Sequence, residues 1–131
     1  MGGRRSFAGC ALACVALLGA CDKATPAGPS SFTVLYTLVA GGPLVVDSLK
    51  YDDGSGILVK VTAPASGWTT SLTVDAGGSV EERAWLNASG PGSAKLKVSW
   101  TVPGVSTQAD SSYANPVAPQ HFTLSIARRV L

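Results

Sequence analysis

The chain has few of the side chains on which most enzymes and metal sites depend. Its 131 residues include one histidine, His121, and three cysteines, Cys10, Cys14 and Cys21. A serine-histidine-acid site needs its histidine beside a nucleophile, and no Gly-x-Ser-x-Gly motif occurs in the sequence. Zinc sites are built mainly from cysteine and histidine, and the chain after Cys21 offers His121 alone. We therefore expect no catalytic residues, no cofactor and no metal, with His121 facing solvent on a strand.

Calcium is the one metal that acidic residues alone could hold. It takes about six to eight oxygen ligands, so Asp52 and Asp53 would need Asp75, Glu81 or Glu82 to converge on them. The sequence lacks the regularly spaced acidic loop of an EF-hand. A turn built on Asp-Gly explains the same two aspartates without a metal, and we expect the turn.

Net charge is also almost absent from most of the chain. Ten lysines and arginines face eight aspartates and glutamates, and Arg4 and Arg5 account for the whole excess. No basic patch points to nucleic acid. Beyond the N-terminal segment, no long apolar run predicts a membrane-spanning helix.

Residues 1–20 have the layout of a secretory signal peptide. A positively charged start is followed by an apolar run, Phe7–Leu18. As a helix this run would rise about 18 Å, too little for a hydrocarbon core of about 30 Å, so a permanent spanning helix is not expected. The small residues that follow predict cleavage between Ala20 and Cys21.

The four residues Leu18-Gly19-Ala20-Cys21 resemble the lipobox of bacterial lipoproteins. The resemblance implies that the Cys21 thiol carries a lipid and that acyl chains such as palmitate anchor the mature chain to a membrane of the bacterial cell envelope. The domain would then face the periplasm or the exterior. Arg4-Arg5-Ser6-Phe7 resembles a twin-arginine export motif, so both general and twin-arginine export stay open. Asp22 acts as a retention signal in only some bacteria, so the inner and outer membranes both stay open.

A short tether joins this anchor to the rest of the chain. Residues 21–31 contain the cysteine and then DKATPAGPSS, whose prolines, glycine and small polar side chains favour a flexible linker. Ten residues reach at most about 33 Å. Residues 32–131 then form one domain, large enough to bury a core without disulfides or metal. We expect this domain to stay close to the membrane.

The pattern after residue 31 is that of β-strands throughout. In Ala94–Val102 and Gln120–Ala127 apolar and polar residues alternate, as in strands with one buried face. Further strands are expected at Phe32–Val39, Leu44–Tyr51, Ile57–Ala63, Trp68–Val74 and Val80–Asn87, with turn residues between them. Val105–Ala109 is expected as a short strand, and Asp110–Pro119 as a loop. Seven or eight antiparallel strands predict an all-β fold, an immunoglobulin-like β-sandwich, with a small β-barrel as the alternative.

A run of short motifs is shared with one bacterial family. The motifs are Leu49-Lys50-Tyr51-Asp52-Asp53-Gly54, Pro64, Trp68, Leu72-Thr73-Val74-Asp75-Ala76-Gly77, Val80, Ala84 and Leu96-Lys97-Val98-Ser99-Trp100-Thr101-Val102-Pro103-Gly104. Over residues 33–127 they resemble the extracytoplasmic domain of the mycobacterial MmpS proteins. The resemblance implies an immunoglobulin-like sandwich and an accessory role beside RND-type exporters of lipids and siderophores. The chain departs from that family because residues 65–67 separate the proline from the tryptophan, the cysteine pair is missing, and a lipid replaces a spanning helix.

Aromatic side chains supply the candidate binding residues. Trp68 and Trp100 share strand parity with buried positions and are expected in the core. Trp85 shares parity with charged residues and is expected to project outward, where an exposed tryptophan is a typical binding anchor. Tyr113 and Asn115 lie in the long irregular segment 103–119, and ordered loops on sandwiches often carry recognition. The alternatives are a loop that covers Trp85 and a polar crossover at 103–119.

Three hypotheses of function follow from these observations. The first is a membrane-anchored, non-enzymatic envelope lipoprotein whose sandwich binds a neighbouring protein, such as a transport complex. The second is a sandwich that binds a small ligand, a glycan or a lipid through its aromatic residues. The third, an enzyme, requires His121 or the acidic turn at Asp52 to take part in chemistry, and it is disfavoured.

Overall fold

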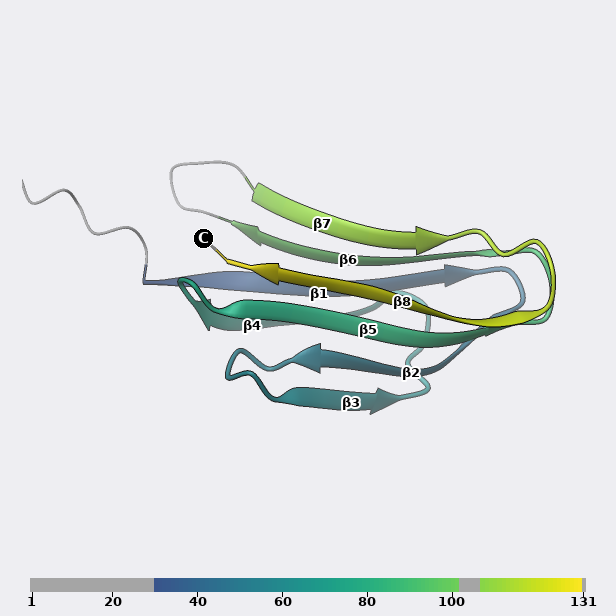
Figure 1. Cartoon of the computed structure of the whole chain (residues 1–131), viewed down its shortest axis with the longest axis horizontal. Helices are drawn as coiled ribbons and strands as arrows, with labels where there is room; N and C mark the ends of the chain where they lie inside the picture. Colours follow the sequence, from purple (N-terminus) through teal and green to yellow (C-terminus); the bar gives the residue numbers. More distant parts are fainter. Residues whose placement is uncertain (1–29, 102–106, 131) are drawn as a thin grey trace, which may run out of the picture.

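Two four-stranded β-sheets packed face to face make up the part of the chain that the structure describes (Figure 1). The computed structural model describes residues 30–101 and 107–130, in which every regular element is a strand. No helix in these two ranges is long and apolar enough to cross a membrane. The strands are β1 (Ser31–Gly41), β2 (Leu44–Asp52), β3 (Leu58–Thr62), β4 (Trp68–Asp75), β5 (Ser79–Ala88), β6 (Ser93–Thr101), β7 (Thr107–Ala114) and β8 (Gln120–Arg129).

All strand pairs are antiparallel, and the predicted all-β sandwich is confirmed. One sheet has the order β4-β1-β6-β7 and the other β3-β2-β5-β8. In the described part of the chain the two sheets stay separate and do not close into the barrel considered as the alternative. Only β2–β3 and β6–β7 are neighbouring strands of one sheet that also follow each other in sequence, so most connections cross between sheets.

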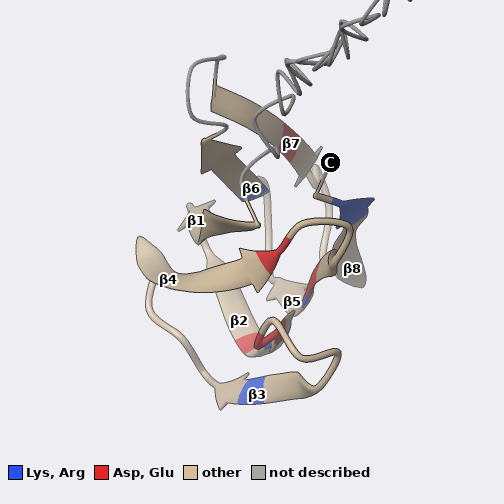
Figure 2. Ribbon diagram, turned by 90° about the vertical axis from the view of Figure 1, so that its left-hand side faces the viewer, with Lys and Arg blue, Asp and Glu red and all other residues tan. Residues whose placement is uncertain are grey.

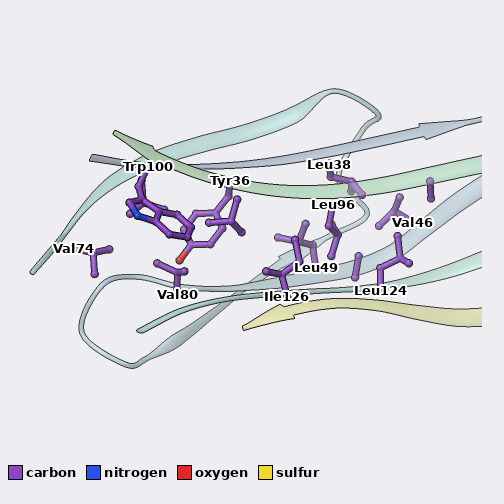
Figure 3. Packing of buried hydrophobic residues seen from close by; sticks show 14 of the residues in the cluster. Tyr36, Leu38, Val46, Leu49, Val74, Val80, Leu96, Trp100, Leu124 and Ile126 are labelled. Carbon is purple, nitrogen blue, oxygen red and sulfur yellow. The ribbon is translucent and has the colours of Figure 1, made fainter. Parts of the chain in front are cut away.

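The core lies between the sheets, where each strand points alternate side chains inward. In β1 and β6 the inward residues are fully or almost fully buried, among them Tyr36, Leu38, Leu96 and Trp100 (Figure 3). Leu86 and Leu124 face them from the opposite sheet. Burial of one such aliphatic side chain stabilises a fold by about 1.5–3 kcal/mol, so this alternation is what fixes which face of each sheet is internal.

One expectation about the strands was wrong. Asp110–Ala114, expected as the start of a loop, is the second half of β7 and pairs with β6. The inward positions of this edge strand hold Asp110, Ser112 and Ala114, which are only half-buried, so the apolar alternation that marks a strand is missing. Val102 and Val105, also assigned to strands from the sequence, lie outside the described residues.

The two inward-facing tryptophans, both in the β4-β1-β6-β7 sheet, differ in burial. Trp100 is 8 % exposed and belongs to the core as predicted. Trp68 starts the edge strand β4 and faces inward, but it is only half-buried and packs at the margin of the core. Its ring lies 5.5 Å from that of Tyr51, which in turn lies 5.6 Å from Tyr36. An edge strand has no neighbour on one side, which leaves part of the ring exposed.

The sandwich has two distinct ends (Figure 1). At the end that we call the tether end, the chain enters at Ser30, the turn 76–78 forms hydrogen bonds with Val130, and the turn 53–57 lies against β4. The opposite end, which we call the distal tip, consists of the loops 42–43, 89–92 and 115–119. The loop 63–67 lies short of this end, beside Leu38 and Asp47. The long strands separate the two, because eleven residues of β1 span about 36 Å.

Candidate interaction surfaces

The predicted lipidation and cleavage positions, Cys21 and Ala20, lie outside the described residues. The chain that follows them enters the sandwich at Ser30, whose carbonyl oxygen accepts a hydrogen bond of 2.9 Å from the amide of Ala76. Ser31 is then the first residue of β1 and pairs with Asp75. A tether that leads from residue 21 therefore attaches to the tether end and not to the distal tip.

Trp85 lies near the middle of β5 on the outer face of its sheet. Its neighbours Ala84 and Leu86 point into the core, and its partners across the strands are Ser48 and Thr123. The side chain is half-buried, and the ammonium nitrogen of Lys50 lies 5.7 Å from the centre of its ring. A cation over an indole is an attractive contact that also occupies one face of the ring. Trp85 thus projects outward, as its parity predicts, but Lys50 partly covers it.

The surroundings of Trp85 are polar and carry more positive than negative charge. Lys50 pairs across the strands with Lys60 on one side and with Arg83 on the other. Arg83 forms an ion pair with Glu81 on the same strand. An aromatic ring among lysines and hydrogen-bonding groups could accept a sugar or an anionic ligand, provided that Lys50 moves aside.

Tyr113 and Asn115 lie away from Trp85. Tyr113 is 70 % exposed on the outer face of β7, in the other sheet, and pairs across the strands with Lys95. Asn115 is exposed in the loop that follows β7, which belongs to the distal tip. Tyr113 and Asn115 thus lie close together because they are two residues apart in the chain, whereas Trp85 lies on the opposite face of the sandwich.

His121 is exposed on β8, where it pairs across the strands with Asn87 on the same outer face as Trp85. This is the solvent-facing position that the sequence predicts. Within residues 30–101 and 107–130, no group of three histidine, cysteine, aspartate or glutamate residues is placed to hold a metal ion.

Asp52, the last residue of β2, and Asp53, which follows it, stabilise the turn that they begin. The Asp52 Oδ1 atom accepts hydrogen bonds from the amides of Gly54, at 2.7 Å, and Gly56, at 3.0 Å. The Asp53 Oδ1 atom accepts from the amide and the hydroxyl of Ser55, at 2.9 and 2.6 Å, and these bonds lower the pKa of Asp53. Gly54 and Gly56 have φ angles of +93° and +87°, which L-residues rarely adopt. The carboxylates thus stabilise the turn, as expected from the Asp-Gly motif.

The burial of Glu82 was not predicted from the sequence. Its side chain points into the core between Val80 and Ala84, is fully buried, and its two carboxyl oxygens have no hydrogen-bond partner among the described residues. Burial raises the pKa of Glu82 to about 9. The alternation along β5 already places Glu82 on the same inward face as Val80 and Ala84. Charged residues are seldom found inside a core, so this pattern did not lead to a prediction that Glu82 is buried.

Other polar groups are buried near the same end of the core. The Tyr36 hydroxyl donates a hydrogen bond of 3.1 Å to the carbonyl oxygen of Asp52, and burial raises the pKa of Tyr36. The indole nitrogen of Trp100 is buried without a partner among the described residues. Figure 3 shows the rings of Tyr36 and Trp100 side by side, close to Val74 and Val80. This part of the core is lined mainly by apolar side chains, but it also contains the Tyr36 hydroxyl, the Trp100 indole nitrogen and the Glu82 carboxyl group.

A shallow hollow on the surface lies at the tether end, lined by Ser79, Glu81, Arg128 and Arg129 among others. The Nε atom of Arg128 lies 2.6 Å from a carboxylate oxygen of Asp110, and this ion pair connects β8 to β7 in the other sheet. Glu81 is paired with Arg83. Most of the charge around the hollow is therefore engaged within the sandwich.

Comparisons with protein-family models, with curated proteins and with solved structures return no match.

Proposed function

We propose that the chain is a non-enzymatic lipoprotein of the bacterial cell envelope, anchored by lipid on Cys21, whose β-sandwich binds another protein at the membrane. The observation that carries this proposal is Leu18-Gly19-Ala20-Cys21, which closes an apolar segment of signal-peptide length and is followed by a short linker. Two or more acyl chains on one cysteine hold a protein stably at a bilayer, whereas one chain does not.

The form of the domain supports a binding role close to the membrane. The linker reaches at most about 33 Å and attaches to one end of the sandwich only. Asp52 and Asp53, the acids that an enzyme would use, are engaged in a turn, and His121 lies apart from them on an exposed strand face. The resemblance to the MmpS proteins supports an exporter of the envelope as the kind of assembly in which such a domain acts.

The anchor is tested by replacing the lipidated residue. In bacteria that process lipoproteins, Cys21→Ser should abolish incorporation of labelled palmitate and leave an unprocessed precursor, because serine offers no thiol. Cys14→Ser serves as the matched control and should be labelled like the wild type. Continued labelling of the Cys21→Ser protein would contradict the lipid anchor.

Binding of a glycan or small ligand is a second candidate, favoured by the outward position of Trp85 beside Lys50. A ligand that stacks on the ring should shift tryptophan fluorescence to saturation in a titration with envelope glycans. The shift should vanish in Trp85→Phe and persist in Trp68→Phe, which alters an inward-facing ring. A titration without any change in the wild type would count against this function.

A further inference from the structure

Three basic side chains form a row across the outer face of the β3-β2-β5-β8 sheet. Lys60 of β3 is the cross-strand partner of Lys50 of β2, and Lys50 is in turn the partner of Arg83 of β5. Neighbouring strands lie about 4.8 Å apart, so the row spans about 10 Å. Lys60 and Arg83 are exposed, and Lys50 is half-buried. We call these three residues the cationic row; no local pattern in the sequence indicates it, because its members come from three strands.

The cationic row is unfavourable for the sheet on its own, because like charges directly opposite each other on neighbouring strands destabilise the pairing. Among the described residues, Arg83 and Arg128 are the two basic residues that form ion pairs, so neither Lys50 nor Lys60 is neutralised by a carboxylate. Arg83 uses its Nε atom for Glu81, which leaves its two terminal nitrogens to bind the two oxygens of another carboxylate. An anion that spans the row would replace the repulsion with attraction.

The two sides of the cationic row differ in charge. Toward the tether end, the next outward positions hold the acids Asp52 and Glu81, and Figure 2 shows acidic segments at the ends of β2 and β4 and a basic segment in β3. On the other side, the next cross-strand row consists of Thr62, Ser48, Trp85 and Thr123, which carry no charge. One further acid, Asp47, is exposed in the bulge of β2 that precedes Ser48. An anionic ligand that avoids Asp52 and Glu81 therefore lies over the cationic row and the row of Trp85.

Trp85 and its neighbours indicate that this ligand contains rings and hydroxyl groups. The ammonium nitrogen of Lys50 lies 5.7 Å from the centre of the indole. When that flexible side chain turns to bind an anion, it opens this face of the ring for stacking. The hydroxyls of Ser48, Thr62 and Thr123 stand in the same row and both donate and accept hydrogen bonds. An aromatic ring with a few polar groups around it is the usual composition of a small-molecule or sugar site.

We propose that this face binds an acidic glycan, with carboxylate groups on the cationic row and a sugar ring stacked on Trp85. The inference rests on the second candidate function, glycan binding at Trp85, and adds the charge of the sugar and the residues that recognise it. An acidic peptide or an anionic bilayer offers the charge without the rings and hydroxyl groups that match the row of Trp85. The chain as a whole has ten basic and eight acidic residues, which does not favour a ligand as densely charged as nucleic acid.

Calorimetric titration of the full chain in a neutral detergent tests the charge of the ligand. The probes are an oligogalacturonate, which carries one carboxylate per sugar, and the same oligomer with every carboxylate methyl-esterified. The acid should bind at least about tenfold more tightly than the ester, because only the acid forms ion pairs with the cationic row. Between about 0.05 and 0.5 M salt the affinity for the acid should fall at least about fivefold, and the affinity for the ester should not change.

Charge reversal at one residue of the row tests its position. Lys60→Glu should weaken binding of the oligogalacturonate at least about tenfold, because it replaces an attraction with a repulsion. The sheet should tolerate the change, since glutamate opposite Lys50 is a pair of opposite charges. Lys97→Glu is the matched control: Lys97 is exposed on the outer face of the other sheet, and its reversal should alter the affinity less than about twofold. Trp85→Ala should weaken binding of both the acid and the ester.

The outcomes separate this inference from the function on which it rests. Equal binding of acid and ester, lost in Trp85→Ala, would overturn the role of the cationic row and leave glycan binding at Trp85 in place. Equal losses in Lys60→Glu and Lys97→Glu would show a general effect of charge and overturn the site. Polyglutamate or phosphatidylglycerol vesicles that bind as tightly as the oligogalacturonate would assign the row to an acidic peptide or a membrane instead. Binding of neither oligomer would overturn the inference outright.

Discussion

Glu82 is a carboxyl group in a place where a charge is costly. It points inward from β5, has no hydrogen-bond partner among the described residues, and is fully buried. Transfer of an ionised carboxylate into such a site costs several kcal/mol, whereas the protonated acid is far easier to accommodate. The pKa of about 9 means that Glu82 stays protonated in the folded domain at neutral pH.

The stability of the domain should therefore fall as the pH rises. The unfolded chain ionises Glu82 above its ordinary pKa of 4.5, while the folded chain keeps the proton until about pH 9. Between these values the unfolded state gains up to about 1.4 kcal/mol per pH unit, and below 4.5 the effect is absent. Urea unfolding at a series of pH values from about 4 to 10 should show this slope in the wild type.

The Glu82→Gln variant should lose that slope, because glutamine does not ionise. Glu81→Gln is the matched control: Glu81 is next in the chain, but it is half-buried on the outer face and paired with Arg83. It should keep the wild-type dependence. Parallel curves for the wild type and Glu82→Gln would show that Glu82 is ionised in the folded state.

At the scale of elements, the connections between strands are more closely packed than their sequences suggest. A Cβ atom at Gly92 would overlap the side chain of Leu44 and lie 2.6 Å from the carbonyl oxygen of Gly41. Gly90, two residues earlier in the same loop, has only Pro43 near it, at an ordinary contact distance of 3.5 Å. The same loop thus contains one glycine that the packing requires and one that it does not.

Gly92→Ala should destabilise the domain by about 1–3 kcal/mol, the usual cost of overpacking. Gly90→Ala should change the free energy of unfolding by less than about 1 kcal/mol, since its methyl group meets nothing closely. Thermal unfolding of the two variants under one buffer condition gives the comparison. Equal stabilities of the two variants would refute the close contact at Gly92.

Strands with a strong apolar alternation could be predicted from the sequence, and strands without it could not. In β6 and β8 the buried residues recur at every second position, so the alternation alone indicates which face of each strand is internal. In β7 the inward positions are small or polar because the strand is at an edge, where little apolar surface is buried. The sequence of β7 therefore has the composition of a loop.

For the whole molecule, the sandwich follows from the sequence but the order of its strands does not. Strand pairing depends on contacts between residues far apart in the chain, such as Val34 with Trp100, which no local pattern encodes. The same holds for the distal tip, whose loops 42–43, 89–92 and 115–119 are separate in the sequence and meet only in the fold. Single residues were easier: the outward direction of Trp85 followed from its parity alone.

The central position of β1 has a consequence for how the chain folds. β1 is the first strand in the sequence, yet its two neighbours are β4 and β6, the second of which ends at Thr101. In a chain that is delivered N-terminus first, one edge of β1 stays unpaired until β4, which ends at Asp75, has followed, and the other edge until β6 has followed. Non-local pairing of this kind makes folding slow. The sheet that contains β1 is thus completed only after β6 has followed, and until then β1 presents an open edge with which another chain can pair.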